Sequence, residues 1–174
     1  RGGHPDRSKW YHTFGYGNMR DYPLADHKWA IQQLAARYPF MDVNRVGIHG
    51  HSGGGFMSTA AILTYPDFYK VAVSCAGNHD NRIYNRWWSE THHGVKEVVT
   101  DGDTTFNYSI KFNQELVKNL KGRLLLVHGD MDDNVHPANS TRVIDALIRA
   151  NKRFDMLYLP GQRHGFGDMD EYFF

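Results

Sequence analysis

The sequence predicts an α/β fold with a parallel sheet, and two observations lead to this prediction. Four short apolar runs of strand length alternate with segments of helical spacing, which is typical of strands and helices that pack in layers. The chain has 174 residues, of which 41% are hydrophobic and 22% charged, as in an ordinary globular protein. This length favours one domain, or a piece of a larger one.

The first part of the chain predicts an irregular segment followed by a helix. Residues 1–23 are rich in glycine, proline and aromatic residues, which is typical of an irregular surface segment. A helix is predicted over about 22–37, and it ends before Pro39. The apolar residues that set its helical spacing are Leu24, Ile31, Leu34 and Tyr38.

The remaining elements alternate between strand and helix. Strands are predicted at 46–48, 71–74, 124–127 and 156–159, where the residues are mostly valine, leucine and isoleucine. A helix is predicted from Gly53 to about Leu63, and Pro66 stops it. A second helix begins near Pro137. Its apolar stripe consists of Val143, Ile144, Leu147, Ile148 and Ala150.

Charge and hydropathy exclude several classes of protein. The chain has 20 basic and 19 acidic residues and shows no stripe of lysine and arginine, so nucleic acid is not an expected partner. No apolar run approaches the roughly 18–20 residues that span a bilayer. The one cysteine, Cys75, excludes an internal disulfide framework.

A nucleophile motif follows the first predicted strand. The segment Gly50-His51-Ser52-Gly53-Gly54 matches G-x-S-x-G and leads into a helix. In such a tight turn, glycines two positions either side of the serine leave room for the backbone. The Ser52 hydroxyl is then exposed as a nucleophile, and the Gly53 backbone N–H faces a developing oxyanion. The alternative is a glycine-rich turn that is structural or binds phosphate.

Partners for the serine follow two later strands. A serine hydroxyl needs a histidine as base and a carboxylate that orients this histidine. His164 follows the last predicted strand. Asp130, Asp132 and Asp133 follow the strand before it, and spacing alone does not separate them, since one of them would suit the cap of the next helix. The order serine, aspartate, histidine is that of α/β-hydrolases.

Metal chemistry is not expected. The pairs His49 with His51 and His92 with His93 are close in sequence, but neighbouring side chains point in different directions. The sequence has no H-E-x-x-H motif and no paired cysteines. We therefore assign no metal ligand and no cofactor.

Several stretches together resemble the catalytic domain of the prolyl oligopeptidase class of serine peptidases, in its dipeptidyl peptidase IV branch. They are Arg1-Gly2-Gly3, the run 42–48 that leads into the serine motif, the string His128-Gly129 with Asp132-Asp133-Asn134-Val135-His136, and His164-Gly165. The resemblance spans essentially the whole chain. It implies an α/β-hydrolase fold of three layers.

The resemblance also implies site residues. It makes Ser52 the nucleophile, Asp132 rather than Asp133 the triad acid, and His164 the base. Asn134 and Val135 would border the substrate. Tyr84 and Trp88 would line a pocket for a proline ring, a role for which flat apolar side chains are suited. The alternative for this aromatic cluster is a place in the core.

The sequence departs from the family pattern at one position and lacks several of its parts. Gly53 stands where the branch usually carries tyrosine. A tyrosine that supplies the second oxyanion donor, the β-propeller and the acidic residues that hold a substrate's amino terminus would all lie upstream of residue 1. Residues 1–174 are therefore expected to form the C-terminal part of an α/β-hydrolase domain that lacks its N-terminal strands. The outer edge of the nucleophile strand would then be open or paired with another chain.

The resulting functional hypothesis is a serine peptidase that cleaves short peptides after a small residue or proline, through an acyl-enzyme. Removal of N-terminal dipeptides and cleavage inside peptides both remain open. An esterase of the same fold is the nearest alternative, and an inactive hydrolase-like binding module is the alternative from another class. The expected partner is a peptide substrate. A homodimer and a periplasmic or other extracytoplasmic location are compatible with the sequence, which does not decide either.

Overall fold

The computed structural model describes residues 2–167, which form two compact units. One unit contains the described residues up to Met41 together with Asn85–Lys111. The other contains Asp42–Tyr84 together with the described residues from Phe112 onward. Each unit is presented by itself.

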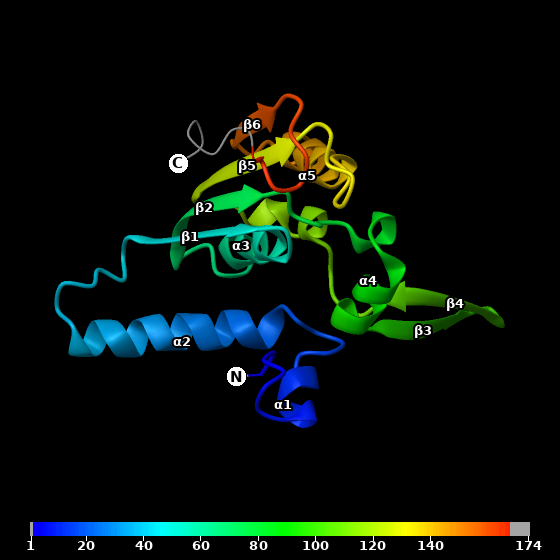
Figure 1. Ribbon diagram of the computed structural model, residues 1–174, viewed down its shortest axis with the longest axis horizontal. Helices are drawn as coiled ribbons and strands as arrows, with labels where there is room; N and C mark the ends of the chain where they lie inside the picture. Colours follow the sequence, from blue (N-terminus) through cyan, green and yellow to red (C-terminus); the bar gives the residue numbers. More distant parts are fainter. Residues whose placement is uncertain (1, 168–174) are drawn as a thin grey trace. The chain divides into compact units, whose positions relative to one another are not determined.

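The second unit is built on a parallel sheet of four strands in the order β1-β2-β5-β6 (Figure 1). The strands are β1 (Val46–His51), β2 (Tyr69–Cys75), β5 (Arg123–Gly129) and β6 (Asp155–Leu159), and every neighbouring pair is parallel. The predicted α/β class and all four predicted strands are confirmed, although each strand extends one to three residues further than its apolar run. Carboxyl ends of parallel strands meet at one edge of a sheet, so the loops after β1, β5 and β6 share that edge.

Two helices accompany this sheet close to their predicted places. α3 (Gly53–Thr64) packs against β1 and β2, and Ser74 Oγ of β2 donates a hydrogen bond to Gly55 O of α3 at 2.7 Å. α5 (Ala138–Arg149) packs against the short 3₁₀ helices η2 (Asn113–Glu115) and η3 (Val117–Asn119). Another 3₁₀ helix, η1 (Asn81–Ile83), follows β2. The fully buried apolar side chains include Phe56, Ile62, Leu63, Leu124, Leu126 and Leu147.

β1 lies at an edge of the sheet. Within residues 2–167 it pairs with β2 and with no other strand. Its burial alternates: Val46, Ile48 and Gly50 are half-buried, whereas Gly47 and His49 are exposed. Among residues 2–167 the outer edge of the nucleophile strand is therefore open, which is one of the two arrangements that the sequence predicts.

The first unit contains elements that the sequence analysis did not predict. α1 (Lys9–Thr13) lies in the segment predicted to be irregular. It forms because Ser8 Oγ accepts a hydrogen bond from the Tyr11 N–H and caps the first turn. α2 (Asp21–Arg37) matches the predicted helix within one residue and buries Leu24.

The region after Tyr84 was given no element from sequence, but it holds α4 (Arg86–His93) and an antiparallel hairpin of β3 (Val95–Thr100) and β4 (Asp103–Tyr108). The hairpin turns at Asp101-Gly102, whose φ angles are 52° and 88°. Asp-Gly between β-branched runs is a strong signal for a two-residue hairpin turn, so the sequence did contain the information.

Candidate active site

Ser52 occupies the sharp turn between β1 and α3. Its φ of 59° and ψ of −121° lie outside the ordinary regions for a residue with a side chain. Two backbone hydrogen bonds hold the turn: the Ser52 N–H donates to Cys75 O at 2.8 Å, and the Phe56 N–H donates to Ser52 O at 3.0 Å. The Ser52 hydroxyl makes no capping bond to α3, so the turn presents it rather than using it to cap the helix.

The positions around Ser52 that require glycine differ from the predicted ones. A Cβ on Gly50 would lie 2.4 Å from Gly54 O, so Gly50 is required, as expected. A Cβ on Gly54 would meet nothing within 4 Å, which corrects the expectation that this position needs glycine. Gly55 needs it instead, because a Cβ there would lie 2.4 Å from Cys75 O of the neighbouring strand.

The structure brings together the three side chains that the sequence singled out. His164 Nε2 lies 2.9 Å from Ser52 Oγ, and His164 Nδ1 lies 2.8 Å from Asp132 Oδ2. An ionised carboxylate only accepts, so Nδ1 carries the proton and Nε2 is left to accept the serine proton. The Asp132 side chain is fully buried and that of His164 is 20% exposed. These contacts have the geometry of a nucleophile, a base and an orienting acid.

The three aspartates of the loop after β5 have separate partners. Asp133 pairs with Arg163 at 2.5 Å, and Asp130 accepts a hydrogen bond from the Gly161 N–H at 2.7 Å. Neither caps α5, whose first N–H, that of Ala138, donates to His136 Nδ1 at 3.1 Å. Asp132 is the carboxylate on His164, the choice that the family resemblance implies over Asp133.

Asp132 is held by its own loop. Its Oδ1 accepts hydrogen bonds from the backbone N–H groups of Asn134 and Val135, at 3.0 and 2.8 Å. Since these donors fix one carboxylate oxygen, the other is directed at His164. The family resemblance implies that Asn134 and Val135 lie beside the substrate, and their backbone hydrogen bonds to Asp132 add a second role.

Gly53 is the first residue of α3. The N–H groups of a first helical turn have no acceptor within the helix, and the helix dipole adds partial positive charge there. The position therefore suits a donor to negative charge next to Ser52.

The residues predicted to border the substrate have different surroundings. The Tyr84 hydroxyl donates to Asn134 Oδ1 at 3.2 Å. Burial and, to a lesser extent, the Asp132 carboxylate raise the pKa of Tyr84, so its hydroxyl stays protonated. Val135 is fully buried, and its place beside the substrate stays a prediction. Trp88 belongs to the other unit, where its ring lies 4.6 Å from that of His92, and its role in a proline pocket stays a prediction.

Two histidines that the sequence analysis left without a role contact the site. The His51 ring lies 4.6 Å from the His164 ring, and His51 Nε2 lies 2.5 Å from His164 O. His128, near the end of β5, is fully buried beside Asp132. Their proximity to strand ends was the signal in the sequence, but it did not distinguish them from other histidines.

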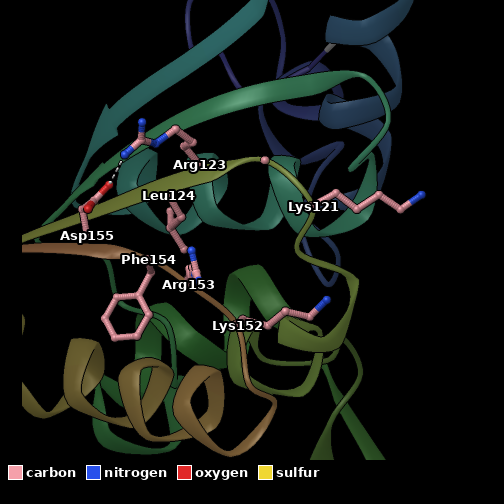
Figure 2. A pocket seen from close by; sticks show the side chains of 8 residues that line it. Lys121, Arg123, Leu124, Lys152, Arg153, Phe154 and Asp155 are labelled. Atoms are coloured by element: carbon pink, nitrogen blue, oxygen red, sulfur yellow. Dashed lines mark hydrogen bonds and ion pairs between the residues drawn. The ribbon is translucent and has the colours of Figure 1, made fainter.

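A pocket of about 670 Å³ lies at the opposite end of the sheet, at the start of β5 and β6 (Figure 2). Three of its cationic side chains have partners: Arg123 lies 3.5 Å from Asp155, and Lys121 Nζ donates to Asp67 at 2.8 Å. Lys152 Nζ donates to Leu120 O at 2.9 Å. This pocket does not contribute to the arrangement around Ser52.

Two features are absent from the part of the chain that the structure describes. None of the helices there has the length and hydropathy to cross a bilayer. None of the described His, Cys, Asp and Glu side chains form a group of three or more that could hold a metal ion.

Comparisons with known proteins agree with the resemblance. A model of the prolyl oligopeptidase family matches residues 1–172. Human dipeptidyl peptidase 8 is 34% identical over 146 residues, which cover 84% of this chain and 16% of that protein. The crystal structure of a candidate dipeptidyl aminopeptidase IV from Bacteroides ovatus superposes with a TM-score of 0.81 at 26% identity, over 94% of this chain and 22% of that one. Porphyromonas gingivalis dipeptidyl peptidase 4 gives 0.76 at 26% identity, over 91% and 22%.

The chain thus spans 16% to 22% of the length of these relatives. The match to the family model covers almost all of its residues and includes Ser52, Asp132 and His164. By sequence and by fold, the chain belongs to the prolyl oligopeptidase family.

Proposed function

We propose that Ser52, His164 and Asp132 form the catalytic centre of a serine peptidase that works through an acyl-enzyme. The observation that supports this most directly is the continuous hydrogen-bonded line from Ser52 Oγ through His164 to Asp132 Oδ2. Each link is within the distance that direct proton transfer needs. Phosphate binding by a glycine-rich turn does not require an imidazole hydrogen-bonded to the serine, whereas acyl transfer requires the His164 ring on Ser52.

The proposed reaction has two halves. In the first, His164 Nε2 takes the Ser52 proton while Oγ attacks the scissile carbonyl carbon, and the same nitrogen then gives this proton to the leaving amine. In the second, water attacks the acyl-enzyme, His164 takes a proton from the water, and the proton returns to Ser52 Oγ. Asp132 holds Nδ1–H throughout and stabilises the imidazolium. The Gly53 N–H donates to the oxyanion.

We further propose that the substrate is a short peptide with proline or another small residue before the scissile bond. Support comes from the relatives named as dipeptidyl peptidases and from Tyr84, whose hydroxyl is held by Asn134 next to the Asp132 loop. The proposal also assigns Trp88 to the wall of the proline pocket.

We propose in addition that residues 1–174 are the C-terminal part of a peptidase domain within a longer protein. Two observations support this: the relatives extend far beyond the matched region, and β1 has one partner among the described strands. The experiments below therefore use the full-length protein that contains this chain.

The test compares three chromogenic substrates: glycyl-prolyl p-nitroanilide, its N-acetylated form and p-nitrophenyl acetate. We expect the free dipeptide substrate to be hydrolysed, and Ser52→Ala to lower turnover by roughly 10⁶-fold because the nucleophile is lost. Equal cleavage of the acetylated substrate would point to an endopeptidase. Hydrolysis of the ester alone would indicate an esterase, and no turnover of any substrate would favour a binding module. Turnover that survives Ser52→Ala would refute the mechanism.

A further inference from the structure

We propose that His128 is a positioning residue for this reaction: its ring holds the Asp132 carboxylate, and through it the His164 ring, in the orientation that proton transfer requires. The inference rests on the proposed function of Ser52, His164 and Asp132. His128 does not touch the substrate in this proposal. It acts through the carboxylate.

Both ring nitrogens of His128 are engaged in the interior of the protein. The side chain has no exposed surface. Its Nδ1 lies 2.7 Å from Ser140 Oγ of α5, and its Nε2 lies 2.8 Å from the backbone carbonyl oxygen of Val135. The ring therefore connects the end of β5 with α5 and with the loop that carries Asp132.

These two partners determine which nitrogen of the His128 ring carries the hydrogen. A carbonyl oxygen only accepts, so Nε2 carries the hydrogen that is donated to Val135 O. A neutral ring then leaves Nδ1 to accept from the Ser140 hydroxyl. Burial lowers the pKa of His128 although Val135 O and Asp132 favour its charged form, and the ring is accordingly neutral at neutral pH. The donor at Nε2 is thus permanent rather than dependent on protonation.

The same Nε2 also faces the catalytic carboxylate. It lies 3.3 Å from Asp132 Oδ2, the oxygen that accepts the hydrogen bond from His164 Nδ1 at 2.8 Å. Oδ1 is occupied by the backbone N–H groups of Asn134 and Val135, so the polar hydrogens that face Oδ2 are those of His164 and, at the longer distance, of the His128 Nε2 that also donates to Val135 O. Without the His128 N–H, Oδ2 would face the His164 ring alone, and the buried Val135 carbonyl would lose the hydrogen bond from His128.

Two substitutions separate this role from a merely structural one. His128→Gln places an amide N–H near the position of Nε2 and can still reach Val135 O and Asp132. His128→Asn is shorter, so it can reach Ser140 but loses the donor toward the carboxylate. Ser140→Ala is the matched control, because it removes the other hydrogen bond of the ring and leaves the Nε2 donor in place.

We expect His128→Asn to lower kcat by about 10- to 100-fold, by analogy with the loss of hydrogen-bond partners that orient metal ligands, with KM changed by less than about threefold. His128→Gln should restore most of this kcat, and Ser140→Ala should stay near wild type. A structural role alone would reduce the amount of folded protein without this split between kcat and KM. Wild-type kcat in folded His128→Asn would overturn the proposal.

The outcome is read together with Ser52→Ala in the same assay. If Ser52→Ala keeps its turnover, the proposed function itself fails. If Ser52→Ala is inactive and His128→Asn is not impaired, only the positioning role fails. Should the His128 variants not fold, neutron diffraction on crystals of the wild-type protein decides: hydrogen on His128 Nε2, directed at Val135 O and Asp132, is expected, and hydrogen on Nδ1 alone would overturn the proposal.

Discussion

At the scale of single residues, Asp132 and Asp133 are neighbours in sequence with opposite environments. The Asp132 side chain is buried on His164, whereas Asp133 is 64% exposed and paired with Arg163. Sequence spacing could not distinguish them, since both follow the same strand. The distinction depends on how the loop closes, and the backbone hydrogen bonds to Asp132 Oδ1 determine this closure.

We predict that Asp132→Asn lowers kcat by about 10³- to 10⁴-fold, because an amide at this place can donate to Nδ1 and so stabilise the wrong tautomer of His164. The matched control is Asp133→Asn. This substitution removes the exposed ion pair with Arg163, which contributes little to stability, and it should change kcat by less than about threefold. Steady-state kinetics on the dipeptide substrate measure both values. An Asp133→Asn loss as large as that of Asp132→Asn would show that the wrong carboxylate is assigned.

At the scale of elements, the turn between β1 and α3 depends on close approach to β2. Gly55 is the contact point, since its Cα faces Cys75 O and a Cβ there would lie 2.4 Å from that oxygen. The motif in the sequence indicates Gly54 rather than Gly55. Whether a glycine is needed depends on the distance to the neighbouring strand, which a motif cannot express.

Gly54→Ala and Gly55→Ala form a matched pair for this contact. We predict that Gly55→Ala lowers the free energy of unfolding by about 1–3 kcal/mol, because the methyl group overlaps the β2 backbone and forces it to shift. Gly54→Ala meets open space and should raise stability by up to about 1 kcal/mol, since alanine favours a helix. Urea denaturation measures both. Equal midpoints for the two variants would contradict the assigned contact.

The sequence predicted the strands of the sheet and α2 well, whereas it did not predict α1, α4 and the hairpin of the other unit. The strands of the sheet contain apolar runs, such as Leu124–Val127 in the mostly buried β5, and these runs leave a clear signal in the sequence. The hairpin from Val95 to Tyr108 exposes most of its side chains, so no such run exists, and the Asp101-Gly102 turn was its main signal. α4 is rich in tryptophan and histidine, and its local cap is Asn85, which accepts a hydrogen bond from the Trp88 N–H.

At the scale of the whole molecule, buried histidines make stability depend on pH. Burial lowers the pKa values of His79 and His93 to about 3. Above about pH 6.5 these side chains are neutral in both the folded and the unfolded protein and contribute no pH dependence. Below it the unfolded chain binds protons that the folded protein excludes until about pH 3. Stability therefore falls as the pH is lowered, by up to about 1.4 kcal/mol per pH unit for each histidine.

We predict that the urea midpoint of the full-length protein decreases between pH 7 and pH 5, and that His79→Gln reduces this decrease. His27→Gln, at an exposed position of α2, is the control and should leave the dependence unchanged. Equal pH dependence in wild type and His79→Gln would mean that the buried ring does not exclude protons as the structure indicates.

The central claim is that Ser52 is a nucleophile activated by His164 and Asp132, and covalent labelling tests it most directly. The full-length protein is treated with a fluorophosphonate, digested and mapped by mass spectrometry. We predict an adduct on Ser52, formed far more slowly in His164→Gln because the serine proton then has no acceptor. An unmodified Ser52 in protein that still hydrolyses peptides, or an adduct on Ser52 that forms as fast without His164, would contradict the account.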